Sequence, residues 1–544
     1  MGATLRALRA LVLLCGFYLL SLVLLAALAA LDAAAFGWAP AAVAGKIAIV
    51  SLLLAVPIVR GMVMLRTPRG EGPAGIVVTE ADEPRLWALV RELASATGTP
   101  APDTIVLTGD VNAAVSEEPR LLGLRPGPRR LYLGVPLLTG LTEARLRAVL
   151  AHEYGHFTGG DTRLSALVVR GRAQIGRTVG HFHARADSRE AAERARQEQA
   201  AAKRTAKGRK AKEIDTAGAG FTYRMMAAVY TAYAKLYMRA TLSTARAQEY
   251  AADLAAARIA GRDATASALR EIPVLAAAHG FYLESYATLG LPARRLPPRG
   301  QFFGGFGRML TARAAELARL REKLPTEPAS PYDSHPPIAD RVARVEELPA
   351  DGRGAEDGDP ALALLADPAR TLAALEDAVL TDEVRQFERA PGWEPLLDSS
   401  MAVGLATLDT PLHRALAFHT QDLPTLPALL TVIDEGQLWQ LAQRLPLSEE
   451  AAATQAEEFR ERVRPVLRDS LQSMVLAEFS ARSLLHWEFS WSRPAAVRLP
   501  GSASDLDGEA GTEAALGAAV DAALADHPDT APLRALLPPA PQPA

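Results

Sequence analysis

Cysteine is nearly absent from this chain of 544 residues, which contains a single one, Cys15. One cysteine excludes an intramolecular disulfide and also a zinc module built from cysteines. The chain has no glycine-rich phosphate loop with its lysine, so nothing indicates nucleotide dependence. The net charge of −3 gives no reason to expect binding to nucleic acid. We therefore expect neither a disulfide-stabilised fold nor a nucleic-acid partner.

Long apolar runs are confined to the N-terminal part of the chain. Residues 11–31 carry no charge and are long enough to span a bilayer as a helix. Residues 41–65 form a second candidate, although Lys46, Pro57 and Arg60 interrupt it. We expect two transmembrane helices. The alternative for the first run is a cleaved signal peptide, whose apolar core is usually shorter.

Basic residues near the ends of these runs predict their orientation. Arg6 and Arg9 precede the first run, arginines follow the second, and the connecting segment 32–40 has no lysine or arginine. Because cytoplasmic ends of membrane spans are enriched in lysine and arginine, both outer ends are expected in the cytoplasm. The sequence thus predicts a multi-pass protein of the cell membrane, in contact with lipid, whose remaining chain lies on the cytoplasmic side.

His152, Glu153 and His156 form an H-E-x-x-H pattern in a run that is typical of an apolar helix. Residues four apart lie on one face of a helix, so both imidazoles can reach one metal ion while Glu153 lies beside the attacking water. Thr142 is suited to cap this helix. The pattern is typical of a zinc peptidase, and the alternative is a core helix with two hydrogen-bonded histidines.

A third metal ligand is needed, because catalytic zinc sites hold the metal with three protein side chains. Glu249 and Asp253 are four residues apart in another helical pattern and therefore face the same way. Glu249 can bind the metal, and Asp253 can accept the free ring N–H of a ligating histidine. Without the first motif, both would be interpreted as surface charges on a helix.

Taken in order, these motifs resemble the HtpX and CAAX-prenyl-endopeptidase family of membrane zinc metallopeptidases. The resemblance covers roughly residues 73–350. It rests on His152-Glu153-Tyr154-Gly155-His156 with Gly160-Asp161, on Arg246 with Glu249 and Ala252-Asp253, and on Ser334-His335-Pro336-Pro337 leading to Arg341. Ala245 stands where the family usually has serine, which leaves the expected ligand in place.

The resemblance implies a gluzincin-type active site with one Zn²⁺ per chain. It assigns His152, His156 and Glu249 as the metal ligands and Glu153 as the general base. The residues that would support these ligands are Asp253, Arg246 and Asp161.

Two further features concern the substrate. By the same resemblance, Asn112, Ala113 and Ala114 are candidates for a strand edge that pairs with an extended peptide, since unpaired backbone groups bind peptides independently of sequence. An ordinary turn or strand is the alternative. His335 has two open roles: it can cap the helix that follows, or it can donate a hydrogen bond to the oxyanion in catalysis.

The expected fold is mainly α with a small β-sheet, an α+β zincin-like core preceded by the two membrane helices. Strand-like segments at 104–107, 111–115 and 130–133 lead into the motif helix. We expect a membrane anchor at 1–72, a metallopeptidase domain at 73–350 with a charged insertion at about 184–220, and a helical accessory domain at 351–544 with a disordered tail. The insertion is either a solvated segment or a site for anionic lipid.

The sequence therefore predicts a membrane-anchored, zinc-dependent endopeptidase whose substrates are misfolded or membrane proteins. The alternative is a catalytically inactive scaffold in which zinc stabilises the fold and the C-terminal region acts. The intact Glu153 favours the enzyme, because a structural metal site needs no base. Residues 351–544 are a candidate surface for a protein partner.

Overall fold

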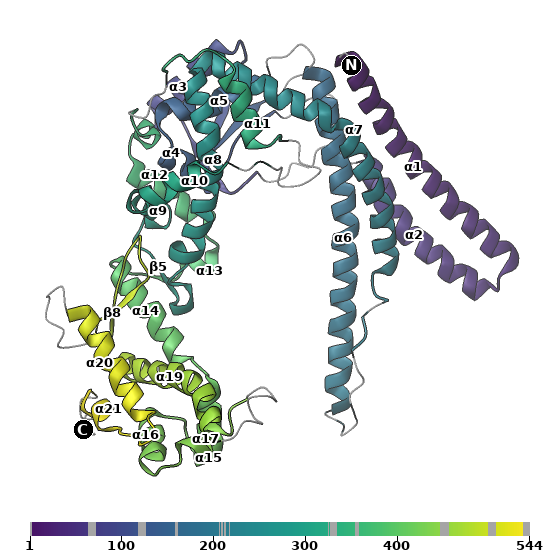
Figure 1. Ribbon diagram of the computed structural model, residues 1–544. Helices are drawn as coiled ribbons and strands as arrows, with labels where there is room; N and C mark the ends of the chain where they lie inside the picture. Colours follow the sequence, from purple (N-terminus) through teal and green to yellow (C-terminus); the bar gives the residue numbers. More distant parts are fainter. Residues whose placement is uncertain are drawn as a thin grey trace. The chain divides into compact units, whose positions relative to one another are not determined.

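The computed structural model describes residues 3–63, 72–117, 127–157, 162–205, 207, 210, 214–216, 218–324, 326, 335–353, 358–446, 456–498 and 508–536. The chain is 70% helical with few small sheets, which confirms the expected fold class. It folds into two compact units (Figure 1): the first contains Met1–Leu275 and Ala318–Pro368, and the second contains Ala276–Leu317 and Ala369–Ala544. The second unit thus begins within the predicted metallopeptidase domain, at Ala276.

Two apolar helices open the first unit, α1 (Ala3–Trp38) and α2 (Ala41–Val63). Among the described residues, two stretches are long and apolar enough to cross a membrane, Val12–Trp38 and Ala41–Val59. The connecting segment predicted at 32–40 is largely helical instead, because an alanine-rich run continues α1. Asp32 therefore lies inside α1, where its carboxylate accepts a hydrogen bond of 2.7 Å from the Ser51 hydroxyl of α2.

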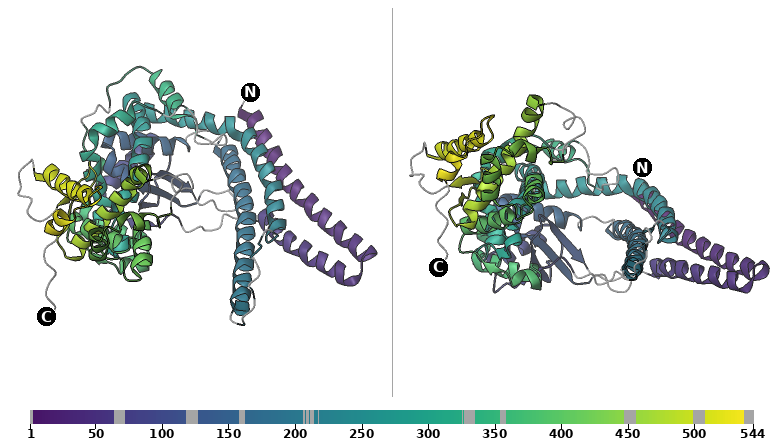
Figure 2. Two further views of the ribbon diagram at one scale, coloured as in Figure 1. Left: turned by 60° about the horizontal axis from the view of Figure 1, so that its bottom comes forward. Right: turned by 90° about the horizontal axis from the view of Figure 1, so that it is seen from below.

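The long helices α6 (Thr162–Thr205) and α7 (Phe221–Ala260) pack on each other and on α1 and α2 (Figures 1 and 2). A row of large side chains on α7, mostly tyrosines, is buried in this contact, with Phe17 of α1 and Phe182 of α6 among its neighbours. The buried residues of this row are Tyr223, Met226, Tyr230 and Tyr237. Helix α6 also includes the first part of the predicted insertion, and residues 206–217 are only partly described.

A four-stranded sheet follows α2, with the strand order β1-β2-β4-β3. Its strands are β1 (Gly75–Val78), β2 (Thr104–Thr108), β3 (Ala113–Glu117) and β4 (Arg129–Gly134). β2 and β4 are parallel, whereas the two outer pairs are antiparallel. Three strands were expected and β1 was not. Among the described strands, β3 pairs only with β4, so it forms an edge of the sheet.

The first unit also contains the motif helix α5 (Glu143–Gly155). Thr142 caps it as expected, because the threonine side chain accepts a hydrogen bond of 3.4 Å from the backbone N–H of Arg145. α5 contacts both α3 and α7. The other elements are α3 (Pro84–Ala96), α4 (Val135–Gly140), α11 (Ile338–Glu346) and η4 (Ala361–Leu364), and α8 (Arg262–Tyr282) and α10 (Ala314–Arg321) run across the boundary of the two units.

The second unit is helical with two short two-stranded sheets. Its elements are η2 (Leu283–Ala287), η3 (Leu291–Ala293), β5 (Arg295–Leu296), α9 (Gln301–Ala312), α12 (Pro368–Val379), α13 (Asp382–Arg385), β6 (Glu388–Arg389), α14 (Trp393–Ala406), α15 (Pro411–Thr420), α16 (Leu426–Asp434), α17 (Leu438–Ala442), α19 (Ala456–Ala481), β7 (His486–Glu488), β8 (Ala496–Arg498), α20 (Gly508–Ala523) and α21 (Ala531–Leu536).

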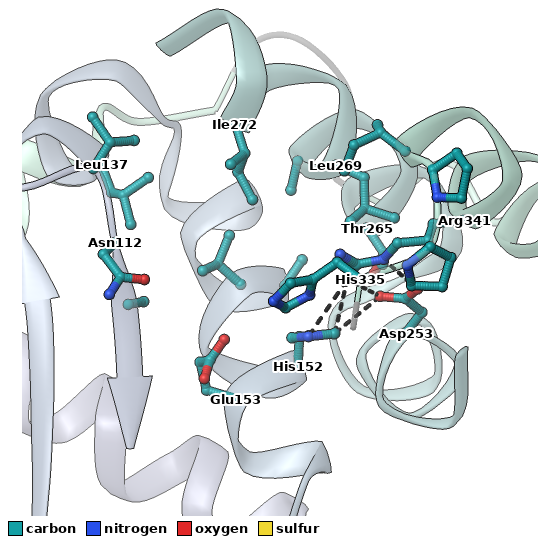
Figure 3. A pocket seen from close by; sticks show the side chains of 18 residues that line it. Asn112, Leu137, His152, Glu153, Asp253, Thr265, Leu269, Ile272, His335 and Arg341 are labelled. Carbon is teal, nitrogen blue, oxygen red and sulfur yellow. Dashed lines mark hydrogen bonds and ion pairs between the residues drawn. The ribbon is translucent and has the colours of Figure 1, made fainter. Parts of the chain in front are cut away.

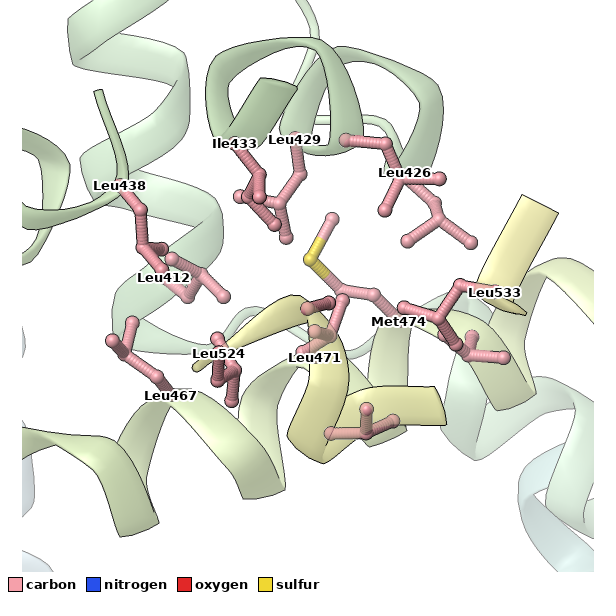
Figure 4. Close-up of a cluster of buried hydrophobic side chains, with 14 of the residues drawn as sticks. Leu412, Leu426, Leu429, Ile433, Leu438, Leu467, Leu471, Met474, Leu524 and Leu533 are labelled. Atoms are coloured by element: carbon pink, nitrogen blue, oxygen red, sulfur yellow. The ribbon is translucent and has the colours of Figure 1, made fainter. Parts of the chain in front are cut away.

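The C-terminal helices of this unit share one apolar core, made mostly of leucine side chains from α15 to α21 (Figure 4). Leu467, Leu471 and Met474 of α19 are buried at its centre, against Leu429 and Ile433 of α16. This confirms the helical patterning of the C-terminal region. The tail expected to be disordered, from residue 537 onward, lies outside the described residues.

Candidate active site

Three side chains that can bind a metal converge between α5 and α7. The ligand atoms of His152, His156 and Glu249 all lie within 4.8 Å of one another. Nε2 of His152 is 3.7 Å from one oxygen of Glu249, and Nε2 of His156 is 3.6 Å from the other. Tetrahedral zinc with bonds of about 2.0–2.1 Å places its ligand atoms about 3.4 Å apart. The three residues therefore surround a position for one zinc ion, and the most widely spaced ligand atoms would approach each other by up to about 1.4 Å to bind it.

Gly155, between the two histidines, allows α5 to lie close to α7. A Cβ atom built on Gly155 would be 3.0 Å from the Cα atom of Ala252, which is closer than most real Cβ contacts. A larger residue would thus separate the helix that carries the histidines from the helix that carries Glu249. The role of this glycine was not predicted, although its place inside the motif was a signal for it.

The protonation states of His156 and Glu249 suit metal binding. His156 keeps 31% of its side chain exposed. Loss of solvent contact and the neighbouring His152 charge nevertheless lower its pKa to about 4, so its ring is neutral at pH 7. Burial alone would raise the pKa of Glu249, but a hydrogen bond from His335 and the nearby positive charges hold it below its usual value. A neutral imidazole and an ionised carboxylate are the forms that bind metals.

His152 is held by a buried pair of charged residues. Its Nδ1 atom lies 2.9 Å from an oxygen of Asp253, the residue for which the sequence predicted a supporting role. Arg341 donates two hydrogen bonds to Asp253, of 2.9 and 2.7 Å. Burial would raise the pKa of Asp253, but these bonds keep it lowered. Because Nδ1 of His152 is engaged, Nε2 is directed to the metal position.

Arg341 closes the last family-like motif in the sequence, but sequence reasoning did not assign it to the site. Its side chain is 8% exposed, and one of its nitrogens lies 3.6 Å from Glu249. A cation buried next to both acidic residues of α7 is therefore part of the centre. The sequence signal that could have identified it was its position four residues after Pro337, at the end of the family-like motif.

Glu153 and His335 lie on the same pocket as His152 (Figure 3). Burial raises the pKa of Glu153 to about 7, so this carboxyl group can accept and donate a proton near neutral pH. Nδ1 of His335 lies 2.8 Å from an oxygen of Glu249, and 58% of the His335 side chain is exposed. Helix α11 begins at Ile338, and its N-cap residue Pro337 makes no side-chain cap hydrogen bond.

The other residues predicted for the site lie in different places relative to the pocket. Asn112 and Ala113 line the pocket at the start of β3, and Ala114 follows on the same edge strand. Arg246 lies on α7, one turn before Glu249, and its Nε atom is buried without a hydrogen-bond partner among the described residues. Asp161 lies outside the described residues.

Comparisons with known proteins agree with this geometry. Residues 80–349 match the model of peptidase family M48, a family of metal-dependent proteases. Similar curated proteins include the "Protease HtpX homolog" of Tropheryma whipplei strain Twist and that of strain TW08/27. Each is 31% identical over 91 residues, which are 17% of this chain and 30% of the relative. No solved structure matches the chain.

The matched stretch thus spans about 30% of the length of these relatives. The two apolar N-terminal helices, together with the HtpX relatives, indicate a membrane protein. The family model covers both histidines, Glu153, Glu249 and His335. Residues 80–349 therefore form an HtpX-like domain of peptidase family M48, a family of metallopeptidases.

Proposed function

We propose that this protein is a zinc-dependent endopeptidase, anchored in the cell membrane, that cleaves internal peptide bonds of misfolded or membrane proteins. The observation that carries the proposal is the convergence of His152, His156 and Glu249, with all ligand atoms within 4.8 Å, beside a pocket that also contains Glu153. A structural metal site needs neither the adjacent base nor the pocket.

In this proposal Glu153 takes a proton from the attacking water and passes it to the leaving nitrogen. Its pKa of about 7 suits both steps, because the group changes its protonation state with little cost near neutral pH. Zinc bound by the three ligands would polarise the scissile carbonyl and acidify the water. Arg341 and Asp253 hold the His152 ring in the orientation that leaves Nε2 available.

The substrate would bind as an extended strand along β3. This strand has β4 on one side and no other strand partner among the described residues, so backbone groups on its outer side can pair with a peptide. Asn112 and Ala113 bring this edge to the pocket of Glu153. His335, next to Glu249, would donate a hydrogen bond to the oxyanion that develops on the scissile carbonyl.

The membrane helices would determine where the active site works, and the second unit would bind a partner. With α1 and α2 spanning the membrane and their outer ends in the cytoplasm, the active site works on the cytoplasmic side. The second unit, which contains most of residues 351–544, is proposed as the surface for a protein partner.

The test is Glu153→Gln in the full-length protein, purified in detergent, loaded with zinc and given an unfolded casein-like substrate. We expect about 10²- to 10⁴-fold slower cleavage with one zinc ion retained per chain. Glu143→Gln, on the same helix but 32% exposed, is the matched control and should keep activity. A chelator should abolish wild-type cleavage.

Two results would contradict the proposal. Cleavage by Glu153→Gln that remains both fast and chelator-sensitive would exclude Glu153 as the base. A wild-type protein that binds one zinc ion and cleaves nothing would instead support the inactive scaffold.

A further inference from the structure

Helix α7 is apolar on two opposite faces along residues 221–237. One face carries the row of tyrosines that is buried against α1, α2 and α6. The residues of the other face are 37–62% exposed: Phe221, Met225, Val229 and Leu236. A helix that is apolar all round belongs in a protein core or in a membrane. Because α7 has an exposed apolar face next to the two predicted membrane helices, we expect that face to contact lipid.

Hydrogen bonds from α7 to α1 give the direction in which α7 runs. The Tyr233 hydroxyl donates to the carbonyl of Leu13, and the Tyr230 hydroxyl lies 2.9 Å from the hydroxyl of Ser21. Residue numbers thus fall along α7 as they rise along α1, so the two helices are antiparallel. The first residues of α7 therefore lie towards the end of α1 that leads into α2.

The active site and the start of α7 consequently lie at opposite ends of this helix bundle. Glu249 comes 16 residues after Tyr233 on the same helix, which is about 24 Å along the helix axis. The apolar stretch of α1 begins at Val12, beside the contact of Leu13 with Tyr233. Glu249 therefore lies outside the end at which this stretch begins, and the connection between α6 and α7 lies at the other end.

Helix α6 continues past the start of α7 and forms, with the segment that returns to α7, an arm made of residues 187–220 (Figure 1). A Cβ atom built on Gly220 would be 2.7 Å from the carbonyl oxygen of Ala186, so these two residues lie side by side at the base of the arm. From Ala186 to Thr205, α6 extends for about 28 Å.

The arm is longer than the connection between the two membrane helices. The Tyr223 hydroxyl donates a hydrogen bond of 3.4 Å to the carbonyl of Leu53, so the base of the arm lies near this part of α2. Two residues before Leu53, Ser51 binds Asp32 of α1. From Asp32 to Trp38, α1 rises by only about 9 Å. With α1 and α2 spanning the membrane, the arm therefore projects from the membrane face opposite to the active site.

Side-chain contacts hold the arm together. The Gln197 amide forms two hydrogen bonds with the backbone of Asp215, of 2.7 and 2.8 Å. Glu190 pairs with Arg224 and accepts a hydrogen bond of 3.3 Å from the Thr216 hydroxyl. The segment that returns to α7 is thus attached to α6, and the arm is a folded element.

The end of the arm is strongly basic. Its exposed basic residues are Lys203, Arg204, Lys207 and Lys210. None of these four side chains forms an ion pair within the part of the chain that the structure describes. Arg209 and Lys212 lie outside the described residues, and the sequence has no acidic residue from 199 to 212. This short segment thus concentrates positive charge in a chain whose net charge is −3.

We propose that the end of the arm binds a polyanion, a phosphate-rich polymer of the cell envelope, on the membrane face opposite to the active site. Closely spaced cations bind a polymer with many fixed negative charges because its condensed counterions are released. Such binding requires a high density of positive charge and no pocket. With the active site in the cytoplasm, the polymer lies outside it.

Two other partners fit the arm less well. Anionic lipid headgroups lie at the bilayer surface, whereas the end of the arm is about 28 Å from its base. A protein partner usually needs large aromatic or aliphatic side chains as anchors. Residues 197–212 contain no aromatic residue, leucine, isoleucine, valine or methionine. Charge is therefore the feature of this segment that a partner can recognise.

The first experiment tests on which face the arm lies. In the full-length protein with Cys15→Ser, Ala202→Cys places a thiol on the exposed surface of the arm. Glu80→Cys places a thiol on the first unit, where the native side chain is 56% exposed. In sealed vesicles of one orientation, a membrane-impermeant maleimide should label only one of the two before detergent is added. Labelling of both, or of neither, would overturn the inference.

The second experiment measures binding of fluorescent inorganic polyphosphate to the full-length protein in a non-ionic detergent, at increasing salt concentrations. One variant combines Lys203→Gln, Lys207→Gln and Lys210→Gln. It should bind about 10- to 100-fold more weakly near physiological salt, and its slope of log affinity against log salt should be shallower by about two to three. Equal affinity and slope, or a wild type that binds no polyphosphate, would contradict the proposal.

A second triple variant is the matched control for charge. Arg258→Gln, Arg319→Gln and Lys323→Gln remove the same charge from exposed positions of the first unit outside the arm. Its affinity for polyphosphate should equal that of the wild type. An equal loss in both triple variants would show that only the net charge of the protein matters, and the assignment to the arm would be wrong.

A third measurement separates the polymer from lipid. The rate of maleimide labelling of Ala202→Cys should be the same in nanodiscs of neutral phosphatidylcholine and in nanodiscs rich in anionic phosphatidylglycerol. Slower labelling in the anionic nanodiscs would assign the basic end to lipid headgroups and remove the polymer. None of these measurements uses a peptide substrate, so their outcome is independent of the proposed peptidase activity.

Discussion

Arg341, Asp253 and His152 contact one another beside the proposed metal position, and one Arg341 nitrogen also lies 3.4 Å from Nε2 of His152. Two hydrogen bonds fix the Asp253 carboxylate to Arg341, and the carboxylate lies 2.9 Å from Nδ1 of His152. A ligating histidine binds metal best when its second nitrogen is held by an acceptor, because this fixes both the tautomer and the ring orientation. We therefore expect the affinity of the proposed centre for zinc to depend on residues that do not contact the metal.

Asp253→Asn tests this dependence. The amide keeps the size of the side chain but accepts hydrogen bonds less strongly and carries no charge for Arg341. We expect about 10- to 100-fold weaker zinc binding, measured by competition with a chelator of known affinity. Asp340→Asn is the matched control: Asp340 is exposed on α11, one residue before Arg341, and its loss should leave zinc affinity unchanged. Equal zinc affinity of Asp253→Asn and the wild type would contradict the supporting role.

Sequence spacing was sufficient to predict that His152 and His156 share one face of a helix next to Glu153, because i and i+4 positions face the same way on a helix. Glu249 lies 93 residues after His156, and spacing alone could not show which carboxylate approaches them. Leu137 and Leu269, which line the pocket beside Glu153, were beyond prediction, since an apolar residue on a helix looks the same whether it faces a core or a pocket.

At the scale of elements, the site depends on how closely α5 approaches α7. His152 and His156 belong to one helix and Glu249 to the other, and Gly155 lies where the two backbones meet. A methyl group at this position would be 3.0 Å from the Cα atom of Ala252. Backbone atoms cannot rotate away as a flexible side chain can, so a larger residue must move a whole helix.

Gly155→Val should therefore weaken zinc binding at least tenfold, because a separation of the helices pulls Glu249 away from the histidines. Zinc content per chain after dialysis against a weak chelator measures the effect. Gly280→Val provides the control: Gly280 is also helical, but a Cβ atom there meets nothing within 4 Å. If both variants retain the same zinc content as the wild type, the close approach of α5 and α7 does not determine the site.

Local sequence signals predicted elements best where the chain has clear caps and periodicity. Thr142 marked the start of α5 because its side chain can accept a backbone hydrogen bond, and the structure has this bond. The first apolar run was predicted to end at residue 31, because a charged residue such as Asp32 is typical of a loop, but α1 continues to Trp38. Inside α1 its carboxylate instead accepts a hydrogen bond from Ser51 of α2. A residue pattern along the chain does not show that a polar side chain has a hydrogen-bond partner elsewhere in the fold.

At the scale of the whole molecule, the chain leaves the first unit at Ala276 and returns to it at Ala318. Glu376 shows what links the inserted segment to the C-terminal region. It is fully buried, accepts a hydrogen bond of 2.7 Å from the backbone N–H of Phe302, and pairs with Arg389 at 2.6 Å. A buried carboxylate requires such partners. They lie up to 74 residues away in sequence, so no local pattern predicted that 276–317 belongs to the second unit.

The orientation of the membrane anchor is open to a direct test, because the chain has one cysteine. In a Cys15→Ser background, single cysteines report which side of the membrane each position occupies. Trp38→Cys lies at the end of α1, where the native side chain is 91% exposed. Glu80→Cys lies beyond α2 on the surface of the peptidase unit, where the native side chain is 56% exposed.

In right-side-out vesicles, a membrane-impermeant maleimide should label Trp38→Cys at once and Glu80→Cys only after detergent is added. The reason is the absence of lysine and arginine between the spans and the arginines on both outer sides, which favour cytoplasmic ends. Both cysteines react in detergent from the start, which controls for reactivity. Immediate labelling of Glu80→Cys in sealed vesicles would place the active site outside the cytoplasm. The substrates of the peptidase would then be extracytoplasmic proteins, while the chemistry of His152, Glu153 and His156 would be unchanged.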